Sequence, residues 1–186
     1  CLLSNVPIQT TYIDDEANAG RMGARLMAIV VKGSNGRIYI SPTREHESIA
    51  HEANPSWKPD VPTWGTGGSN GIGRRYGFNV FGDYFVPRQL VALITLTDLI
   101  QEAHKKISQD IKILSNTENN AGSYADAVAL YLAFSVDKGV DYWSTVCSWH
   151  SSKELIRNTF GRQVIPMSWD YAETNIFSDS TGNISS

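Results

Sequence analysis

Two long stretches of the sequence repeat apolar residues at three- and four-residue steps, the period of a helix packed on one side. The first stretch runs from Pro87 to Leu114, and a proline suits a first helical turn because its missing N–H costs nothing there. The second is predicted to begin at Ser123, with Asp126 at the capping-box position and residues 115–122 as the linker. Helices joined by so short a linker are expected to pack antiparallel.

The apolar side chains predicted to meet between these helices form one stripe on each. On the first helix the stripe is Leu90, Val91, Ile94, Ile100, Ala103, Ile107, Ile111 and Leu114. On the second it is Ala125, Val128, Ala129, Leu132, Ala133 and Val136, continuing to Val140, Trp143 and Cys147 with a point of interruption at Gly139.

The N-terminal part of the chain predicts a β-hairpin. Residues 26–31 and 37–40 are apolar and rich in β-branched side chains, and the Asn-Gly pair within 32–36 favours a tight turn between two strands. Residues 1–20 look irregular, and residues 43–53 are expected to form a short, highly charged helix.

We therefore expect an α+β, mainly helical fold, in which a small N-terminal β-hairpin region precedes an antiparallel helical bundle. Its predicted parts are residues 1–53 (hairpin with short helix), 54–86 (a loop rich in proline and glycine) and 87–186 (a helical domain). Within the last part, further short helices are expected around 153–159 and 166–174.

The composition limits the classes of function. A hydrophobic fraction of 41% predicts a packed core, and a net charge of −3 argues against tight non-specific binding of nucleic acid. With Cys1 and Cys147 as the two cysteines, a disulfide framework is not implied and a cytoplasmic location is expected. No apolar run approaches the roughly 20 residues of a membrane span, so a membrane partner is not expected. A start at Cys1 rather than Met suggests processing or a boundary within a longer protein.

Sequence motifs of catalysis are missing. An adenine methyltransferase needs a [DNS]-Pro-Pro-[YFW] loop to hold the flipped base, and Asn54-Pro55-Ser56-Trp57 reads better as an ordinary turn. The glycine run at residues 65–70 lacks the last glycine of a dinucleotide fingerprint and the Gly-Lys-Ser/Thr of a P-loop. We predict no catalytic residue in this chain.

A metal site is not predicted either. Ser4 stands where a zinc knuckle beginning at Cys1 would place its second thiolate, and His46 and His51 fit a surface helix better than a metal pair. Cys147 lies on the apolar stripe, so a nucleophile pairing with His150 is the less favoured interpretation.

Two groups of residues are suited to contact DNA. The combination of arginine with asparagine or glutamine fits phosphate and base edges, and the same side chains also serve in helix caps and ion pairs. The candidates are Arg157, Asn158, Arg162 and Gln163, and secondarily Arg74 and Arg75 at the end of the glycine run.

A third cluster combines aromatic rings with carboxylates and could line a pocket or simply close the edge of a domain. Its members are Trp169, Asp170, Glu173 and Asn175.

Four blocks of sequence carry a resemblance to a known family. They are residues 19–31, 81–93, 124–132 and 156–183, and together they cover essentially the whole chain in the right order. The chain resembles an internal segment of the large prokaryotic adenine-specific DNA methyltransferases that carry an N-terminal domain of unknown function and a zinc-ribbon-like insertion.

The resemblance implies that the cofactor motif lies upstream of Cys1 and the catalytic Pro-Pro motif downstream of Ser186. S-adenosylmethionine is then the cofactor of the parent protein, with none expected in this chain, and residues 1–53 are the remnant of the ribbon. Cys1 matches the last cysteine pair of the ribbon, whereas Ser4 departs from it, and Ile184 stands where family members have Trp.

Three functions follow as alternatives. The segment is inactive alone and grips or positions duplex DNA for the rest of the parent methyltransferase, or it is a purely structural helical insertion that packs on the catalytic domain without a ligand. The third alternative is a small independent enzyme built on Trp169, Asp170 and Glu173.

Overall fold

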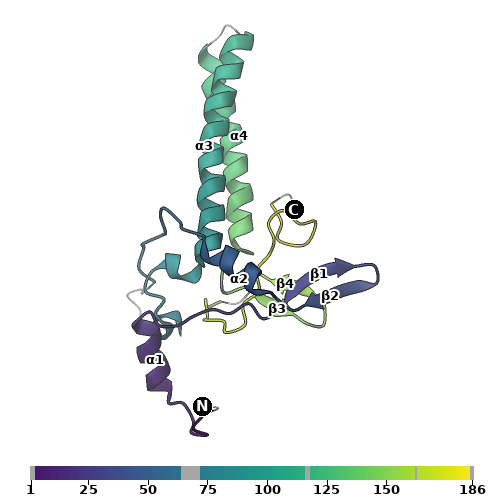
Figure 1. Cartoon of the computed structure of the whole chain (residues 1–186). Coiled ribbons are helices and arrows are strands. Elements are labelled where there is room, and N and C mark those ends of the chain that lie inside the picture. Colours follow the sequence, from purple (N-terminus) through teal and green to yellow (C-terminus); the bar gives the residue numbers. More distant parts are fainter. Residues whose placement is uncertain (1–2, 64–71, 116–117, 162, 185–186) are drawn as a thin grey trace.

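The computed structural model describes residues 3–63, 72–115, 118–161 and 163–184, and it belongs to the α+β class (Figure 1). The elements follow one another as α1 (Thr10–Asn18), β1 (Ile29–Gly33), β2 (Gly36–Ile40), α2 (Arg44–His51), the 3₁₀ turns η1 (Ile72–Tyr76) and η2 (Phe81–Tyr84), α3 (Pro87–Ser115), α4 (Glu118–Val140), β3 (Ser148–His150) and β4 (Leu155–Arg157).

Helices α3 and α4 form the expected antiparallel pair, which rises from a base made by the rest of the molecule (Figure 1). Leu90 near the start of α3 and Ala125 on α4 are buried, and the predicted stripes are mostly half-buried between the helices. Leu114, which is predicted to lie in the stripe, is 85% exposed. The pair is a two-helix hairpin, and the described residues hold no third long helix that would make it a bundle.

The predicted ends of α4 are wrong. The helix begins at Glu118, so Ser123 and Asp126 lie inside it, and Asp126 Oδ1 instead lies 2.7 Å from His104 Nε2 on α3. The helix ends at Val140, because the chain turns there to place Trp143 against the open backbone of Gly139. Residues 118–122 are thus helical although asparagine and glycine have low helix propensity.

The β-hairpin is confirmed. Ile29 pairs with Ile40 and Val31 with Ile38, and Gly36 has a φ of +131°, which glycine tolerates in the turn. The short charged helix is also confirmed as α2, where Thr43 and His46 form a reciprocal cap at its start.

Residues 1–20, predicted to be irregular, contain α1. This helix is held by η1, since Arg75 Nη2 lies 2.8 Å from Asp14 Oδ2 and the Gly77 backbone approaches the Ala17 carbonyl too closely for any Cβ. The contact between Asp14 of α1 and Arg75 of η1 joins residues 61 positions apart, which explains why the local sequence pattern did not predict the helix.

The proline- and glycine-rich region is more ordered than a plain loop in its described part. Pro62 bridges to Val80, and Asp83 accepts hydrogen bonds from the backbone N–H groups of Asn79 and Val80 at 2.9 Å each. The glycine run at 65–70 lies outside the described residues.

The predicted helix around 153–159 is wrong, because these residues form the turn and second strand of a β3–β4 hairpin with Glu154 at φ +50°. Residues 166–174 form turns and extended segments instead of a helix. Runs as short as Leu155–Arg157 do not distinguish strand from helix by periodicity, and here the pairing with Ser148–His150 decides.

The base of the hairpin is tied by side chains from distant segments. Trp143 Nε1 donates to the Gly182 carbonyl at 2.7 Å, and Thr145 donates through both its N–H and its hydroxyl to the Tyr84 carbonyl. Most of the buried apolar side chains lie in this base. The full set of buried apolar residues among those described is Ala17, Tyr84, Leu90, Ala125, Trp143, Val146 and Cys147.

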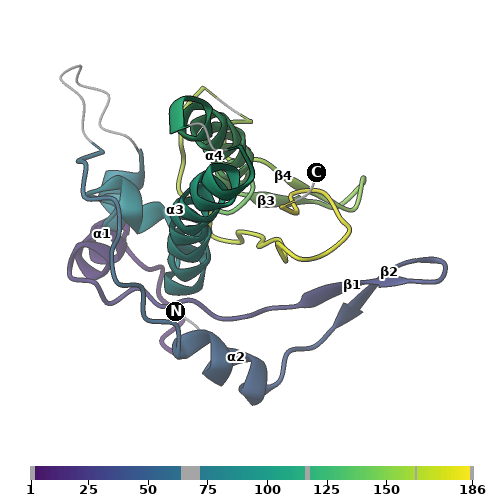
Figure 2. The same ribbon diagram turned by 90° about the horizontal axis from the view of Figure 1, so that it is seen from above.

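The accessible area of the chain is far larger than its mass leads one to expect. It is 13,379 Å², whereas a compact monomer of 20.5 kDa exposes about 8,900 Å². Seen from above, β1 and β2 extend away from the helical pair (Figure 2). In the described part of the chain, no helix has the length and apolarity needed to cross a membrane.

Candidate functional site

The predicted DNA-contacting residues near β4 differ in their exposure and in their contacts. Arg157 is exposed at the end of the strand, and Gln163 is exposed beyond it. Asn158 donates its side-chain amide to Asp141 Oδ2 at 2.7 Å, so this group holds the turn after α4 together. Arg162 lies outside the described residues.

Arg74 and Arg75 lie in η1 beside α1, on the other side of the helical pair from β4 (Figure 2). The hydrogen bond and charge of Asp14 raise the pKa of Arg75, and its guanidinium is occupied by that carboxylate. Arg74 is exposed. Among the described residues, the structure thus does not bring Arg157 onto one surface with Arg74 and Arg75.

The four pocket candidates make different contacts. Trp169 is exposed and meets Tyr76 edge to face at 5.6 Å, and Asp170 is exposed beside it. Glu173 pairs with Arg88 at the start of α3. Asn175 accepts the backbone N–H of Phe177.

Within the predicted pocket cluster, Glu173 has a structural role that the sequence did not reveal, because it forms an ion pair with Arg88. Burial opposes the charge of Arg88, but the hydrogen bond and charge of Glu173 outweigh it and raise its pKa. Burial, followed by the nearby Glu173 carboxylate, raises the pKa of Tyr171. These groups anchor the C-terminal segment on α3.

Cys147 and His150 do not form a nucleophile pair. The Cys147 thiol is fully buried and contacts the hydroxyls of Thr159 at 3.5 Å and Ser144 at 3.8 Å. His150 Nδ1 lies 3.1 Å from the hydroxyl of Ser152. The cysteine is part of a small buried polar cluster rather than a reactive centre.

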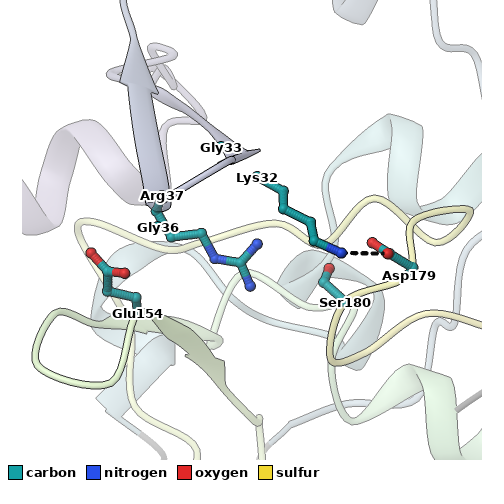
Figure 3. A pocket seen from close by; sticks show the side chains of 7 residues that line it. All are labelled: Lys32, Gly33, Gly36, Arg37, Glu154, Asp179 and Ser180. Atoms are coloured by element: carbon teal, nitrogen blue, oxygen red, sulfur yellow. Dashed lines mark hydrogen bonds and ion pairs between the residues drawn. The ribbon is translucent and has the colours of Figure 1, made fainter.

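A shallow hollow of about 260 Å³ lies between the tip of the β1–β2 hairpin and the C-terminal segment (Figure 3). Lys32 Nζ lies 2.9 Å from Asp179 Oδ2, and the hydrogen bond from Lys32 lowers the pKa of Asp179. Arg37 and Glu154 also line it, so each positive charge has a carboxylate nearby. This balance of charge does not favour an anion or a cation. Nor do the described residues hold three or more His, Cys, Asp or Glu side chains gathered to bind a metal.

Two uncovered apolar surfaces are the more distinctive features. The first, which we term the aliphatic face, is the side of the β1–β2 hairpin shared by the directly paired residues Ile29, Val31, Ile38 and Ile40. Ile38 and Ile40 are 53% and 45% exposed. The opposite side carries Tyr39, whose ring meets Trp149 edge to face.

The second surface is the outer stripe of α4, which comprises Tyr124, Leu130, Tyr131 and Phe134, with Ala127 between them. Residues at steps of three, four and seven share one side of a helix, and all of these side chains are exposed. Because Ala125, Val128, Ala129 and Val136 face α3, the helix is apolar on both sides. Helices of that kind are normally buried all round.

No protein-family model matches the chain, and the searches of curated proteins and of solved structures give no significant match.

Proposed function

We propose that the chain is a structural docking module of an S-adenosylmethionine-dependent, adenine-specific DNA methyltransferase, and that it packs against the rest of that enzyme. The observation that carries the docking role is the accessible area of 13,379 Å², about 4,500 Å² more than a compact monomer of this mass exposes. Exposed large apolar side chains contribute to it, among them Ile38 and Ile40 of the aliphatic face. Surfaces of this kind mark sites of protein contact.

The methyltransferase part of the proposal rests on the four blocks of resemblance. In that arrangement the module lies between the cofactor motif and the Pro-Pro motif, and S-adenosylmethionine and the target base bind to other parts of the enzyme. The ion pair of Arg88 and the hydrogen bonds of Asp141 and Trp143 would then keep the helical hairpin at a fixed angle to the base.

The gene supplies the first test. A [DNS]-Pro-Pro-[YFW] sequence encoded beyond Ser186 supports the methyltransferase proposal, and a stop codon directly after Ser186 contradicts it. The complete gene product should then transfer labelled methyl groups from S-adenosylmethionine to adenine in duplex DNA.

The docking role is tested by a double substitution on the aliphatic face. Ile38→Asp with Ile40→Asp should make the complete enzyme aggregate or lose methyl transfer, because two charges would be buried without partners. Exchanging the exposed Arg44 and Glu45 of α2 for alanine is the matched control and should leave the yield and activity unchanged. Equal behaviour of the two variants would contradict docking through this face.

DNA contact is the second candidate function, and the exposed position of Arg157 at the end of β4 favours it. Anisotropy of labelled duplex DNA at about 50 and 200 mM salt tests this, because phosphate contacts weaken steeply with salt. Loss of binding in Arg157→Ala would support the contact, and unchanged affinity at low salt would remove the residue from it.

A further inference from the structure

The outer stripe of α4 has the arrangement of a surface that pairs with a copy of itself. Between Tyr124 and Val136, Asp126 and Ser135 are the only polar residues. The upper part of the hairpin stands clear of the other described segments (Figure 1), so nothing described covers the stripe. Its large side chains are Tyr124 (60% exposed), Leu130 (54%), Tyr131 (74%) and Phe134 (55%).

We propose that the stripe is a homodimer interface, in which α4 packs antiparallel against α4 of a second copy of the chain. We centre the antiparallel pair between Leu130 and Tyr131. A residue of one copy then lies opposite the residue of the other copy for which the two residue numbers add up to 261. Phe134 then lies opposite the small, exposed Ala127, and Leu130 lies opposite Tyr131. Each bulky side chain meets a gap or a residue of different shape, as ridges-into-grooves packing requires.

The ends of the stripe fit the same register. Tyr124 comes opposite the Asp137–Lys138 end of α4 in the second copy, where a tyrosine ring suits both a carboxylate acceptor and a lysine stem. A parallel pair would instead set Phe134 against Phe134 and Ala127 against Ala127, leaving a void beside a clash. Twofold symmetry makes every contact occur twice, as in the isologous interfaces of most dimers.

The stripe supplies the apolar centre of a dimer interface and does not exhaust the exposed surface. An aromatic side chain buries 150–250 Å², so the exposed parts of Tyr124, Tyr131 and Phe134 offer roughly 280–470 Å² per chain. With the leucine, the alanine and a polar rim, this approaches the roughly 800 Å² per partner of a standard interface. The excess of about 4,500 Å² leaves the aliphatic face for the rest of the enzyme, so dimerisation is independent of the proposed function.

Sedimentation equilibrium of the 186-residue chain tests the proposal. We expect a mass twice that of the monomer at micromolar concentrations, and the monomer mass for Phe134→Asp and for Tyr131→Ser. Ile113→Ser removes an apolar side chain that is 79% exposed near the end of α3, outside the stripe, and should leave the dimer intact. Circular dichroism verifies that each variant keeps its helices.

Disulfide cross-linking tests the register, in a Cys1→Ser background that leaves only the buried Cys147. Leu130→Cys lies next to the proposed twofold axis and should form a covalent dimer, whereas Tyr124→Cys lies far from it and should not. A chain that is monomeric at about 100 µM, a Phe134→Asp variant that still dimerises, or efficient cross-linking through Tyr124→Cys would each overturn the proposal. Protection of the stripe by the rest of the gene product, in a monomeric enzyme, would do so as well.

Discussion

Arg88 in the first turn of α3 donates through Nε to Glu173 Oε2 at 2.9 Å, joining residues that lie 85 positions apart. The pair is partly buried and fixes the C-terminal segment on the root of the helical hairpin. Together with the Trp143–Gly182 hydrogen bond, it makes the base a rigid support from which α3 and α4 project. The proposed docking and dimer surfaces depend on that support for their relative positions.

Glu173→Gln should destabilise the chain, because it leaves the Arg88 charge partly buried without its carboxylate. Hydrogen bonds to charged groups contribute about 1.5–3 kcal/mol, and the partial exposure of both side chains places the expected loss at the lower end. Urea unfolding measures the effect. Asp170→Asn, an exposed residue on the same segment, is the control and should leave the midpoint unchanged.

Asp83 should make the stability depend on pH. Burial disfavours its charge, but hydrogen bonds from Lys58 and from the N–H groups of Val80 and Asn79 outweigh it and lower the pKa of Asp83. Because the folded pKa is lower than the unfolded value near 4, the stabilisation is complete above that value. It is lost as the pH falls through the folded pKa. Unfolding of Asp83→Asn should depend less steeply on pH below about 4, and an unchanged slope would contradict this role.

Substitution of alanine for either of two glycines in α4 should change the free energy of unfolding, with opposite signs at the two positions. A Cβ on Gly139 would lie 2.4 Å from the Trp143 ring, which is buried, so Gly139→Ala should destabilise the chain by about 1–3 kcal/mol. Gly122 has open space at its Cβ position, and Gly122→Ala should stabilise by about 0.5–1 kcal/mol through helix propensity. Thermal unfolding followed by circular dichroism compares them, and a stabilising Gly139→Ala would refute the packing of Trp143.

Two threonines whose hydroxyl groups are buried should also respond differently to substitution by valine. Thr159 Oγ1 lies 2.7 Å from Ser144 Oγ, so Thr159→Val should cost about 1–3 kcal/mol by breaking that hydrogen bond. Among the described residues, Thr174 Oγ1 is buried with no hydrogen-bond partner. Thr174→Val should therefore be neutral or stabilising, because a buried hydroxyl without a partner costs free energy. Chemical denaturation of both variants decides, and equal losses would be the contrary result.

Elements defined by local signals could be predicted from the sequence. Proline at position 87 and a sustained apolar period defined α3, and the Asn35-Gly36 turn defined the β1–β2 hairpin. Elements that depend on distant partners could not. Helix α1 packs against η1 and β4 pairs with β3, and both elements are too short for their local sequence to define them.

The candidate site shows the same division. Arginine and asparagine side chains can bind phosphate, and they can equally stabilise a turn or an ion pair. The sequence alone does not reveal that Asn158 lies beside Asp141 and that Arg75 lies beside Asp14. The second apolar side of α4 was present in the sequence as Tyr124, Leu130, Tyr131 and Phe134. A helix that is apolar on both sides has two such stripes, and the second one does not pack on α3.

Carbene footprinting of the aliphatic face tests the central claim most directly. We predict strong labelling of Ile38 and Ile40 in the 186-residue chain and clear protection of both in the complete gene product, with Leu3, almost fully exposed, as a reference within the chain. Equal labelling of Ile38 and Ile40 in the two proteins would show that the face stays open to water, and would contradict a docking role for this module.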